Sequence, residues 1–169
     1  DQLLDLVEHL RIEPSSRQGV VMMWNPATDG LMAPKKKNVP CPFTYTANII
    51  GNKLNMHLIV RSNDMMLGNP HDVAGFALLQ SMLAQELEVG LGKMTVSISH
   101  AHVYSSHYDQ AMAILNRMPH LHQEVLVKLP PNSFKRALVA DVTLVNELVE
   151  MLQLQYQPMP ALTKMKIAL

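Results

Sequence analysis

Cysteine is almost absent from this sequence: Cys41 is the one cysteine among 169 residues. A single cysteine cannot form an internal disulfide, which is typical of proteins in a reducing, cytoplasmic setting. No apolar run reaches the roughly 18 residues of a membrane-spanning helix, and no signal peptide is visible. We therefore expect a cytoplasmic protein that does not associate with membranes.

An excess of charge of either sign is also lacking, because 14 Lys and Arg residues balance 14 Asp and Glu residues. Such a chain has no global attraction for nucleic acid or anionic lipid, so any anion-binding site must be local. We expect no nucleic-acid partner. With 48% hydrophobic and 17% charged residues, the chain can build a core, and its length predicts a single domain over 1–169.

The hydrophobic periodicity predicts both helices and strands. Amphipathic patterns predict helices over about 2–10, 72–87, 106–118 and 141–154. Apolar or alternating runs predict strands over 19–24, 93–99 and 124–129, and a β-hairpin from 43 to 58 whose turn lies near Gly51 and Asn52. Strands and helices that do not strictly alternate are typical of an α+β fold.

Cys41 lies in "VPCPF", between two prolines and at the start of a predicted strand. A lone cysteine is more often a small buried apolar residue than a reactive one. The alternative is a nucleophile that the flanking prolines hold rigidly and that a nearby cation, with Arg61 as the candidate, favours as the thiolate. The spacing in the sequence leaves both interpretations open.

Two arginines beside serines are candidates for binding an anion. Arg61 and Ser62 end a predicted strand, where a planar guanidinium and a hydroxyl suit a phosphate group. A surface ion pair is the more common role for such an arginine. Arg17, beside two serines, is a similar candidate, whereas the three lysines at 35–37 are typical of a solvated loop.

Three histidines, at 100, 102 and 107, stand close together in "SHAHVYSSH". Neither a cysteine nor a carboxylate stands in ligand spacing beside them, so we favour a structural or substrate-contacting role over zinc. His102 and Tyr104 are two residues apart on a predicted strand and would therefore share one face and contact one ligand. We expect no bound metal.

Taken in order, several motifs resemble thymidylate synthase and its relatives, the pyrimidine nucleotide hydroxymethylases. They are "SSRQGVVMMWNP", "LMA", "PC", "RSNDMMLGNP", "AGFALL", "AHVY" and "YQPMPALTKMKIAL". They extend over nearly the whole chain but correspond only to the later part of that family's usual length. The resemblance implies a mixed β-sheet covered by helices, a homodimer packed through the sheet, and an N-terminal part that this chain lacks.

The resemblance also implies a covalent reaction. Cys41 would add to carbon 6 of a pyrimidine nucleoside monophosphate, which makes carbon 5 the nucleophile towards the one-carbon unit of 5,10-methylenetetrahydrofolate. Arg61 and Ser62 would bind the nucleotide phosphate, and Arg17 would reach the phosphate in the other subunit of the dimer. His102 and Tyr104 would bind the sugar hydroxyl, and Asp64 would face the folate.

The resemblance implies that Asp72 stands where thymidylate synthases have an asparagine that binds uracil. Cytosine reverses the donor and acceptor of that edge, and a carboxyl group can accept from its amino group. An acid here resembles the deoxycytidylate hydroxymethylases, so we expect hydroxymethylation of deoxycytidylate or cytidylate. The alternative role for Asp72 is a helix N-cap, for which aspartate is among the best residues.

Departures from the family pattern keep other functions open. Pro42, Val60 and Gln18 replace the usual histidine, glutamine and second arginine, and "PKKKN" is an insertion. The lysines of this insertion could compensate at the phosphate site. The first alternative is a thymidylate synthase that methylates deoxyuridylate. The second is a non-catalytic nucleotide-binding module, in which Cys41 would form no adduct.

Overall fold

The computed structural model describes residues 1–34, 39–117 and 127–167. Its contacts divide the chain into two compact units, one extending over Asp1–His102 and the other beginning at Val103. The lysines at 35–37, for which we predicted a solvated loop, lie outside the described residues.

A four-stranded mixed sheet forms the centre of the first unit, with the strand order β1-β2-β3-β5. The strands are β1 (Val20–Met22), β2 (Pro42–Ile50), β3 (Lys53–Val60) and β5 (Gly90–Ile98). Adjacent strands β1, β2 and β3 are antiparallel, whereas β5 pairs with β3 in parallel. A parallel neighbour needs a crossover connection, and helix α3 (Gly68–Glu86) provides it.

The predicted hairpin is confirmed. Its turn places Gly51 and Asn52 at φ values of 58° and 57°, a conformation that glycine and asparagine adopt more readily than other residues. Ile50 pairs with Lys53 across this turn, and the ladder continues to Pro42 and Val60. The tight turn therefore sets the register that determines which residues meet at the far end of the hairpin.

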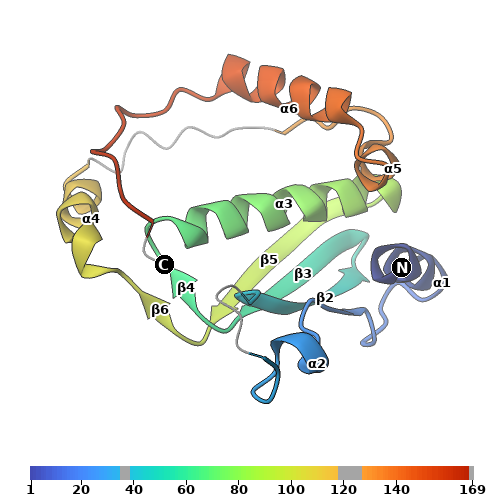
Figure 1. The fold of residues 1–169 in the computed structure, drawn as a ribbon. Coiled ribbons are helices and arrows are strands. Elements are labelled where there is room, and N and C mark those ends of the chain that lie inside the picture. The colour runs from blue at the N-terminus through green and yellow to red at the C-terminus, as the bar shows by residue number, and fades with distance from the viewer. Residues whose placement is uncertain (35–38, 118–126, 168–169) are drawn as a thin grey trace. The chain divides into compact units, whose positions relative to one another are not determined.

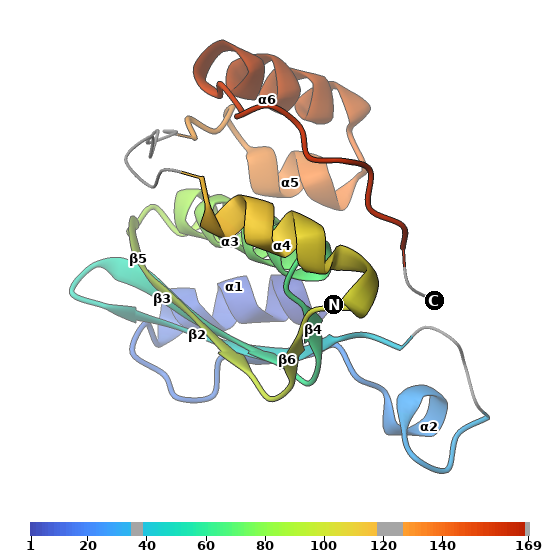
Figure 2. The ribbon, with the colours of Figure 1, turned by 90° about the vertical axis from the view of Figure 1, so that its left-hand side faces the viewer.

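Helices α1 (Gln2–Ile12) and α3 pack against the sheet, and α3 runs along β3 and β5 (Figures 1 and 2). Alternate residues of the hairpin face this core, so Tyr45, Leu54 and Leu58 are almost fully buried. The predicted α+β class, a mixed sheet covered by helices, is confirmed. On α1 the buried side chains are Leu6, Val7 and Leu10, whereas Leu4 is 49% exposed.

Helix α3 begins earlier than the sequence predicts, at Gly68 instead of near Asp72. The prediction was wrong because it took Pro70 as a break. Proline is tolerated in the first turn of a helix, where the backbone N–H groups have no partner within the helix. The earlier start places Asp72 in the second turn, so the N-cap interpretation of Asp72 is also wrong.

Two short strands extend the first unit beyond the main sheet: β4 (Asn63–Asp64) and β6 (Ala101–His102) pair in parallel. Pro26 and the polar residues after it form a short helix, α2 (Pro26–Asp29), where Asn25 is the N-cap. The unit thus has its short strands just beyond the ends of β3 and β5.

The second unit contains a 3-10 turn, η1 (Ser105–His107), and three helices. These are α4 (Tyr108–Leu115), α5 (Ser133–Leu138) and α6 (Val142–Gln155). The predicted helices over 106–118 and 141–154 correspond to α4 and α6, but α5 was not predicted. Of the predicted strand over 124–129, residues 124–126 lie outside the described residues, and 127–129 form no strand.

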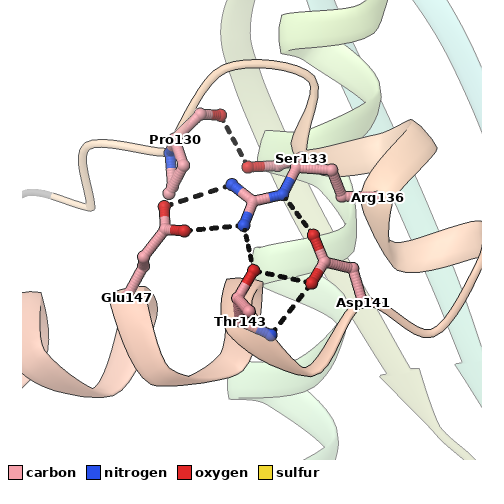
Figure 3. Close-up of polar contacts among 6 residues, drawn as sticks. All are labelled: Pro130, Ser133, Arg136, Asp141, Thr143 and Glu147. Carbon is pink, nitrogen blue, oxygen red and sulfur yellow. Dashed lines mark hydrogen bonds and ion pairs between the residues drawn. The ribbon is translucent and has the colours of Figure 1, made fainter.

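A network of charged side chains joins α5 to α6 (Figure 3). Arg136 donates to Asp141 at 2.7 Å and to both carboxylate oxygens of Glu147 at 2.6 and 3.1 Å. Asp141 is the N-cap of α6 and accepts from the backbone N–H of Thr143 at 2.9 Å. The Thr143 hydroxyl also donates to Asp141, at 2.6 Å. This hydrogen bond, together with those from Arg136 and from the backbone of Thr143, lowers the pKa of Asp141 to about 2.

Candidate functional site

Cys41 and Arg61 are brought together by the hairpin. The backbone N–H of Arg61 donates to the carbonyl oxygen of Cys41 at 2.9 Å, one step beyond the pairing of Pro42 with Val60. Cys41 is a free, half-buried cysteine directly before β2. The prediction that this cysteine stands at the start of a strand is confirmed, and the register explains why residues twenty apart in sequence are neighbours.

The guanidinium of Arg61 holds the segment that leads to Cys41. Its Nε donates to the carbonyl of Pro40 at 2.9 Å, and one terminal nitrogen donates to the carbonyl of Val39 at 3.0 Å. The guanidinium carbon lies 5.6 Å from the ring centroid of Trp24, within the range of a cation–π interaction. No acidic residue in the described part of the chain pairs with Arg61, so its positive charge meets only neutral groups there.

Asp72 contacts a residue that the sequence analysis did not single out. Asn63 of β4 is 2% exposed, and its side-chain nitrogen donates to Oδ2 of Asp72 at 3.0 Å. An ionised carboxylate only accepts hydrogen bonds, so the N–H face of the Asn63 amide must be turned towards it. A hydrogen bond between Asn63 and Asp72 thus connects β4 to the second turn of α3.

The half-buried position of Asp72 changes its proton affinity. Burial raises the pKa of this carboxyl, and the hydrogen bond from Asn63 and the charge of His71 act in the opposite direction. An open hollow of about 310 Å³ is lined by Asp72 and its helix neighbours His71, Gly75, Phe76 and Leu79. A partly desolvated carboxyl beside a hollow is typical of a functional position.

Ser62, Asp64 and His102 lie near these residues along the chain and the short strands. Ser62 is half-buried between β3 and β4. Asp64 pairs with His102 across the β4–β6 ladder, and its Oδ1 accepts from the backbone N–H of Met66 at 2.9 Å. The ring of His102 lies 5.5 Å from that of His100. The parallel ladder therefore brings Asp64 and His102, predicted for different ligands, side by side.

The prediction that His102 and Tyr104 share a strand face is wrong. Strand β6 ends at His102, and Tyr104 belongs to the second unit, where it precedes η1. Two residues of spacing predict a shared face only while the chain stays extended. Within the second unit, the ring of Tyr104 packs edge-on against His107 at 5.9 Å, and His107 is fully buried.

Arg17 is exposed and makes no hydrogen bond or ion pair with the residues that the structure describes. Its neighbour Ser16 is buried and bonds His9 at 2.7 Å. The structure therefore does not bring Arg17 into contact with Arg61 or Ser62. Its guanidinium is accessible from outside the first unit.

Other features bear on the class of site. No three His, Cys, Asp or Glu side chains among the described residues are grouped so that they could hold a metal ion. No helix in the part of the chain that the structure describes is long and apolar enough to cross a membrane. A larger hollow, of about 690 Å³, lies on strands β2, β3 and β5. None of the predicted site residues lines it.

Comparison with known proteins identifies the family. The family model described as thymidylate synthase matches residues 1–168. The chain belongs to the thymidylate synthase family. It is 32% identical over 144 residues to the thymidylate synthases of Listeria monocytogenes serovar 1/2a and Listeria innocua serovar 6a, which covers 85% of this chain and 45% of each relative. The chain thus spans less than half the length of these curated relatives.

A solved structure agrees with this assignment to the thymidylate synthase family. The thermostable thymidylate synthase A from Bacillus subtilis superposes with a TM-score of 0.68 and is 32% identical. The match covers 78% of this chain and 46% of that one. The resemblance to the family that the sequence motifs indicate is therefore confirmed, as is the fold that it implies.

Two residues that contact the candidate site residues were not predicted from the sequence: Asn63 and Trp24. Both lie inside motifs quoted for the resemblance, but neither has a side chain that signals catalysis. Asn63 acts on Asp72 across nine residues and a strand-to-helix connection. Trp24 follows β1 and meets Arg61 only because β1 and β3 flank β2 in the sheet. Such contacts follow from strand order, which the sequence pattern does not give.

Proposed function

We propose that this protein transfers a one-carbon unit to carbon 5 of a pyrimidine nucleoside monophosphate, with cytosine as the preferred base. Membership of the thymidylate synthase family supports the reaction class. The single observation that carries the proposal is the pairing of Cys41 with Arg61 at 2.9 Å through the backbone. It makes a half-buried cysteine and an arginine with no acidic partner among the described residues neighbours across the hairpin.

In the proposed reaction the Cys41 thiolate forms a bond to carbon 6, and the electron pair of the ring double bond moves to carbon 5. Carbon 5 then attacks the methylene carbon, which the co-substrate 5,10-methylenetetrahydrofolate supplies. Loss of the carbon 5 proton and departure of tetrahydrofolate leave an exocyclic methylene group. Addition of water and release of Cys41 give a hydroxymethyl group, and hydride from the folate gives a methyl group instead.

The other predicted residues have proposed roles that fit their contacts. Arg61 and Ser62 bind the nucleotide phosphate, with Arg61 also favouring the thiolate of Cys41. His102 has the proposed role of contacting the sugar hydroxyl; the same role for Tyr104 stays a prediction from the family resemblance. Asp64 faces the folate: one of its oxygens is already held by Met66, and the other can accept an N–H of the pterin ring.

Asp72 supports cytosine as the base. A carboxylate oxygen accepts from the cytosine amino group, whereas it repels the carbonyl oxygen that uracil presents at the same place. The main alternative is methylation of deoxyuridylate, because the curated relatives are named thymidylate synthases. We propose deoxycytidylate or cytidylate as substrate and a hydroxymethyl product.

We further propose a homodimer formed through the open face of the sheet. Helices α1 and α3 pack on one face, whereas the other carries half-buried side chains such as Thr46, Asn48 and His57 around the larger hollow. The exposed Arg17 would then reach the phosphate bound by the other subunit. Light scattering should give the mass of a dimer; a monomer that turns over nucleotide at full rate would contradict this arrangement.

The deciding experiment incubates the protein with 5,10-methylenetetrahydrofolate and deoxycytidylate, cytidylate or deoxyuridylate in turn. Mass spectrometry should find a cytosine nucleotide one hydroxymethyl unit heavier, without the absorbance change that dihydrofolate release produces. Turnover of deoxyuridylate alone, with dihydrofolate released, would establish the alternative.

Cys41 provides the test of catalysis itself. The protein should form a covalent adduct with a 5-fluoropyrimidine nucleotide and folate, and Cys41→Ala should abolish both adduct and turnover while the protein stays folded. A Cys41→Ala variant with unchanged function and no adduct in the parent protein would identify a non-catalytic nucleotide-binding module.

A further inference from the structure

Asn63 is an unusual neighbour for a substrate-binding carboxyl. It is 2% exposed, and β4 fixes its backbone through the hydrogen bond from its N–H to the carbonyl of His100 at 2.9 Å. Its side-chain nitrogen donates to Asp72, but its Oδ1 is buried without a partner among the described residues. An unsatisfied buried acceptor is costly, so a position that keeps it has a use for the amide's other end.

The donated hydrogen bond determines which atoms Asp72 can offer. Nδ2 of Asn63 occupies Oδ2, and no described residue donates to Oδ1. A donor to a carboxylate favours the ionised form, and burial of Asp72 favours the neutral one. Asn63 thus opposes the protonation that burial promotes, and it holds the carboxyl in one rotamer as a pair of acceptors.

The protonation state of this carboxyl decides how well it distinguishes the two bases. An ionised group accepts from the amino group of cytosine but has no proton for the carbonyl oxygen of uracil. A neutral carboxyl has both a donor and an acceptor, so it can also pair with the carbonyl and ring N–H of uracil. Discrimination against uracil therefore depends on the ionised form.

We propose that Asn63 is a positioning residue for base specificity: by donating to Oδ2 of Asp72 it presents Oδ1 as an acceptor for an amino-bearing pyrimidine and excludes the oxo-bearing one. The inference rests on the proposed role of Asp72 in binding the base. It assigns the specificity to a pair of residues, one on β4 and one on α3. The pair acts as a unit because each member is fixed by a different element.

The test replaces the donor and retains the volume. Asn63→Leu should lower the ratio of kcat/KM for deoxycytidylate to kcat/KM for deoxyuridylate by about tenfold, which is the size expected for one hydrogen bond to a charged group. The change should come mainly from a lower KM for deoxyuridylate. Equilibrium binding of the two nucleotides, measured by calorimetry without folate, should show the same shift.

Gln80→Leu is the matched control. Gln80 is another buried amide of the first unit, 4% exposed, but its nitrogen donates to backbone carbonyls of Leu54 and Lys93 at 2.8 and 3.3 Å. Its loss should reduce stability and leave the base ratio unchanged. If Asn63→Leu does not fold, Asn63→Ala supplies the same comparison, and an unchanged base ratio in either folded variant overturns the proposal.

A double-mutant cycle separates this inference from the function on which it rests. In an Asp72→Asn background, Asn63→Leu should no longer change the base ratio, because the group through which it acts is gone. If Asp72→Asn leaves the ratio of the parent protein unchanged, the proposed base-binding role of Asp72 fails. If Asp72→Asn shifts the ratio but Asn63→Leu does not, only the role of Asn63 is overturned.

Discussion

The two units each contain an arginine and an aspartate in well-defined hydrogen bonds, but their partners differ in kind. In the second unit, Arg136 is paired with the carboxylates of Asp141 and Glu147. In the first unit, Arg61 donates to carbonyl oxygens and Asp72 accepts from an amide. In the second unit the arginine is paired with carboxylates, whereas in the first unit the hydrogen bonds of the arginine and the aspartate go to neutral groups.

This difference separates a structural network from a candidate site. In the Arg136 network the single cation is paired with two carboxylates, so its positive charge is fully compensated. Arg61 has no acidic partner among the described residues, and Asp72 is hydrogen-bonded to a neutral amide, with the charge of His71 acting on it as well. Burying charges without a full ion pair carries an energetic cost that is common at functional sites. The neutral hydrogen-bond partners of Arg61 and Asp72 fix geometry without cancelling charge, which suits the proposed roles of binding a phosphate and a base.

The largest expected effect follows from removing the cation. Arg61→Met should weaken binding of a pyrimidine nucleoside monophosphate by about 1,000-fold, as expected when two charge-assisted hydrogen bonds to phosphate are lost. Arg136→Met should leave binding unchanged. Calorimetric titration with deoxycytidylate checks both variants, and equal losses in the two would show that the comparison between the arginines is mistaken.

The next effect concerns the base. Asp72→Asn should change the ratio of kcat/KM between deoxycytidylate and deoxyuridylate by about 100-fold in favour of deoxyuridylate. The reason is that the base which does not match residue 72 leaves polar groups of the site without hydrogen-bond partners. Asp141→Asn, the corresponding change in the second unit, should leave the ratio as it is. Competition between the two nucleotides in one assay measures both variants, and a base preference untouched by Asp72→Asn would remove Asp72 from recognition.

A smaller effect is expected on stability from the second unit. Arg136→Met leaves Asp141 and Glu147 without their shared cation, so the melting temperature should fall by a few degrees while turnover persists. The side chains are partly exposed, which limits the contribution of each ion pair. Differential scanning calorimetry provides the measurement, with Lys128→Met, at an exposed lysine of the same unit, as the control for loss of a positive charge. A melting temperature equal to that of the parent would mean that the network does not stabilise the unit.

Local patterns in the sequence predicted the parts of the fold that depend on neighbouring residues. Alternation in the hairpin and the pair Gly51-Asn52 indicated β2, β3 and their turn, because a two-residue turn sets its own register. The start of α3 was misjudged because a proline in a first helical turn looks the same, in sequence, as a proline that ends a helix. Helix α5 is too short for its periodicity to be recognised.

Cys41 and Arg61 were singled out from the sequence because of their residue types, and Asp72 because of the family resemblance; their roles stay predictions. The contacts that tune these residues were not predictable from the sequence. Trp24, Pro40 and Asn63 act through strand order and register, which bring together segments that no spacing rule connects. Tyr104 shows the converse, because its spacing from His102 implied a shared strand that the chain does not form.

The smallest expected effect is on stability as a function of pH, where ionisation of Asp141 should stabilise the fold and ionisation of Asp72 should destabilise it. Asp141 has a pKa lowered from 3.8 to about 2, so its stabilising effect is full above pH 3.8 and disappears as the pH falls towards 2. Asp72 has a pKa raised above 3.8, so its ionisation costs stability as the pH rises past that value. Asp72→Asn should therefore stabilise the fold at neutral pH, and Asp141→Asn should destabilise it.

Urea unfolding of the three proteins between pH 7 and pH 2 measures these differences. Asparagine caps helices as well as aspartate does, so Asp141→Asn isolates the charge, and in Asp72→Asn the amide oxygen still accepts from Asn63. The gain in unfolding free energy for Asp72→Asn and the loss for Asp141→Asn should both shrink as the pH falls. If both variants change the free energy of unfolding in the same direction at neutral pH, burial does not dominate the pKa of Asp72. Its carboxylate would then be stabilised by its hydrogen-bond and charge partners, as that of Asp141 is.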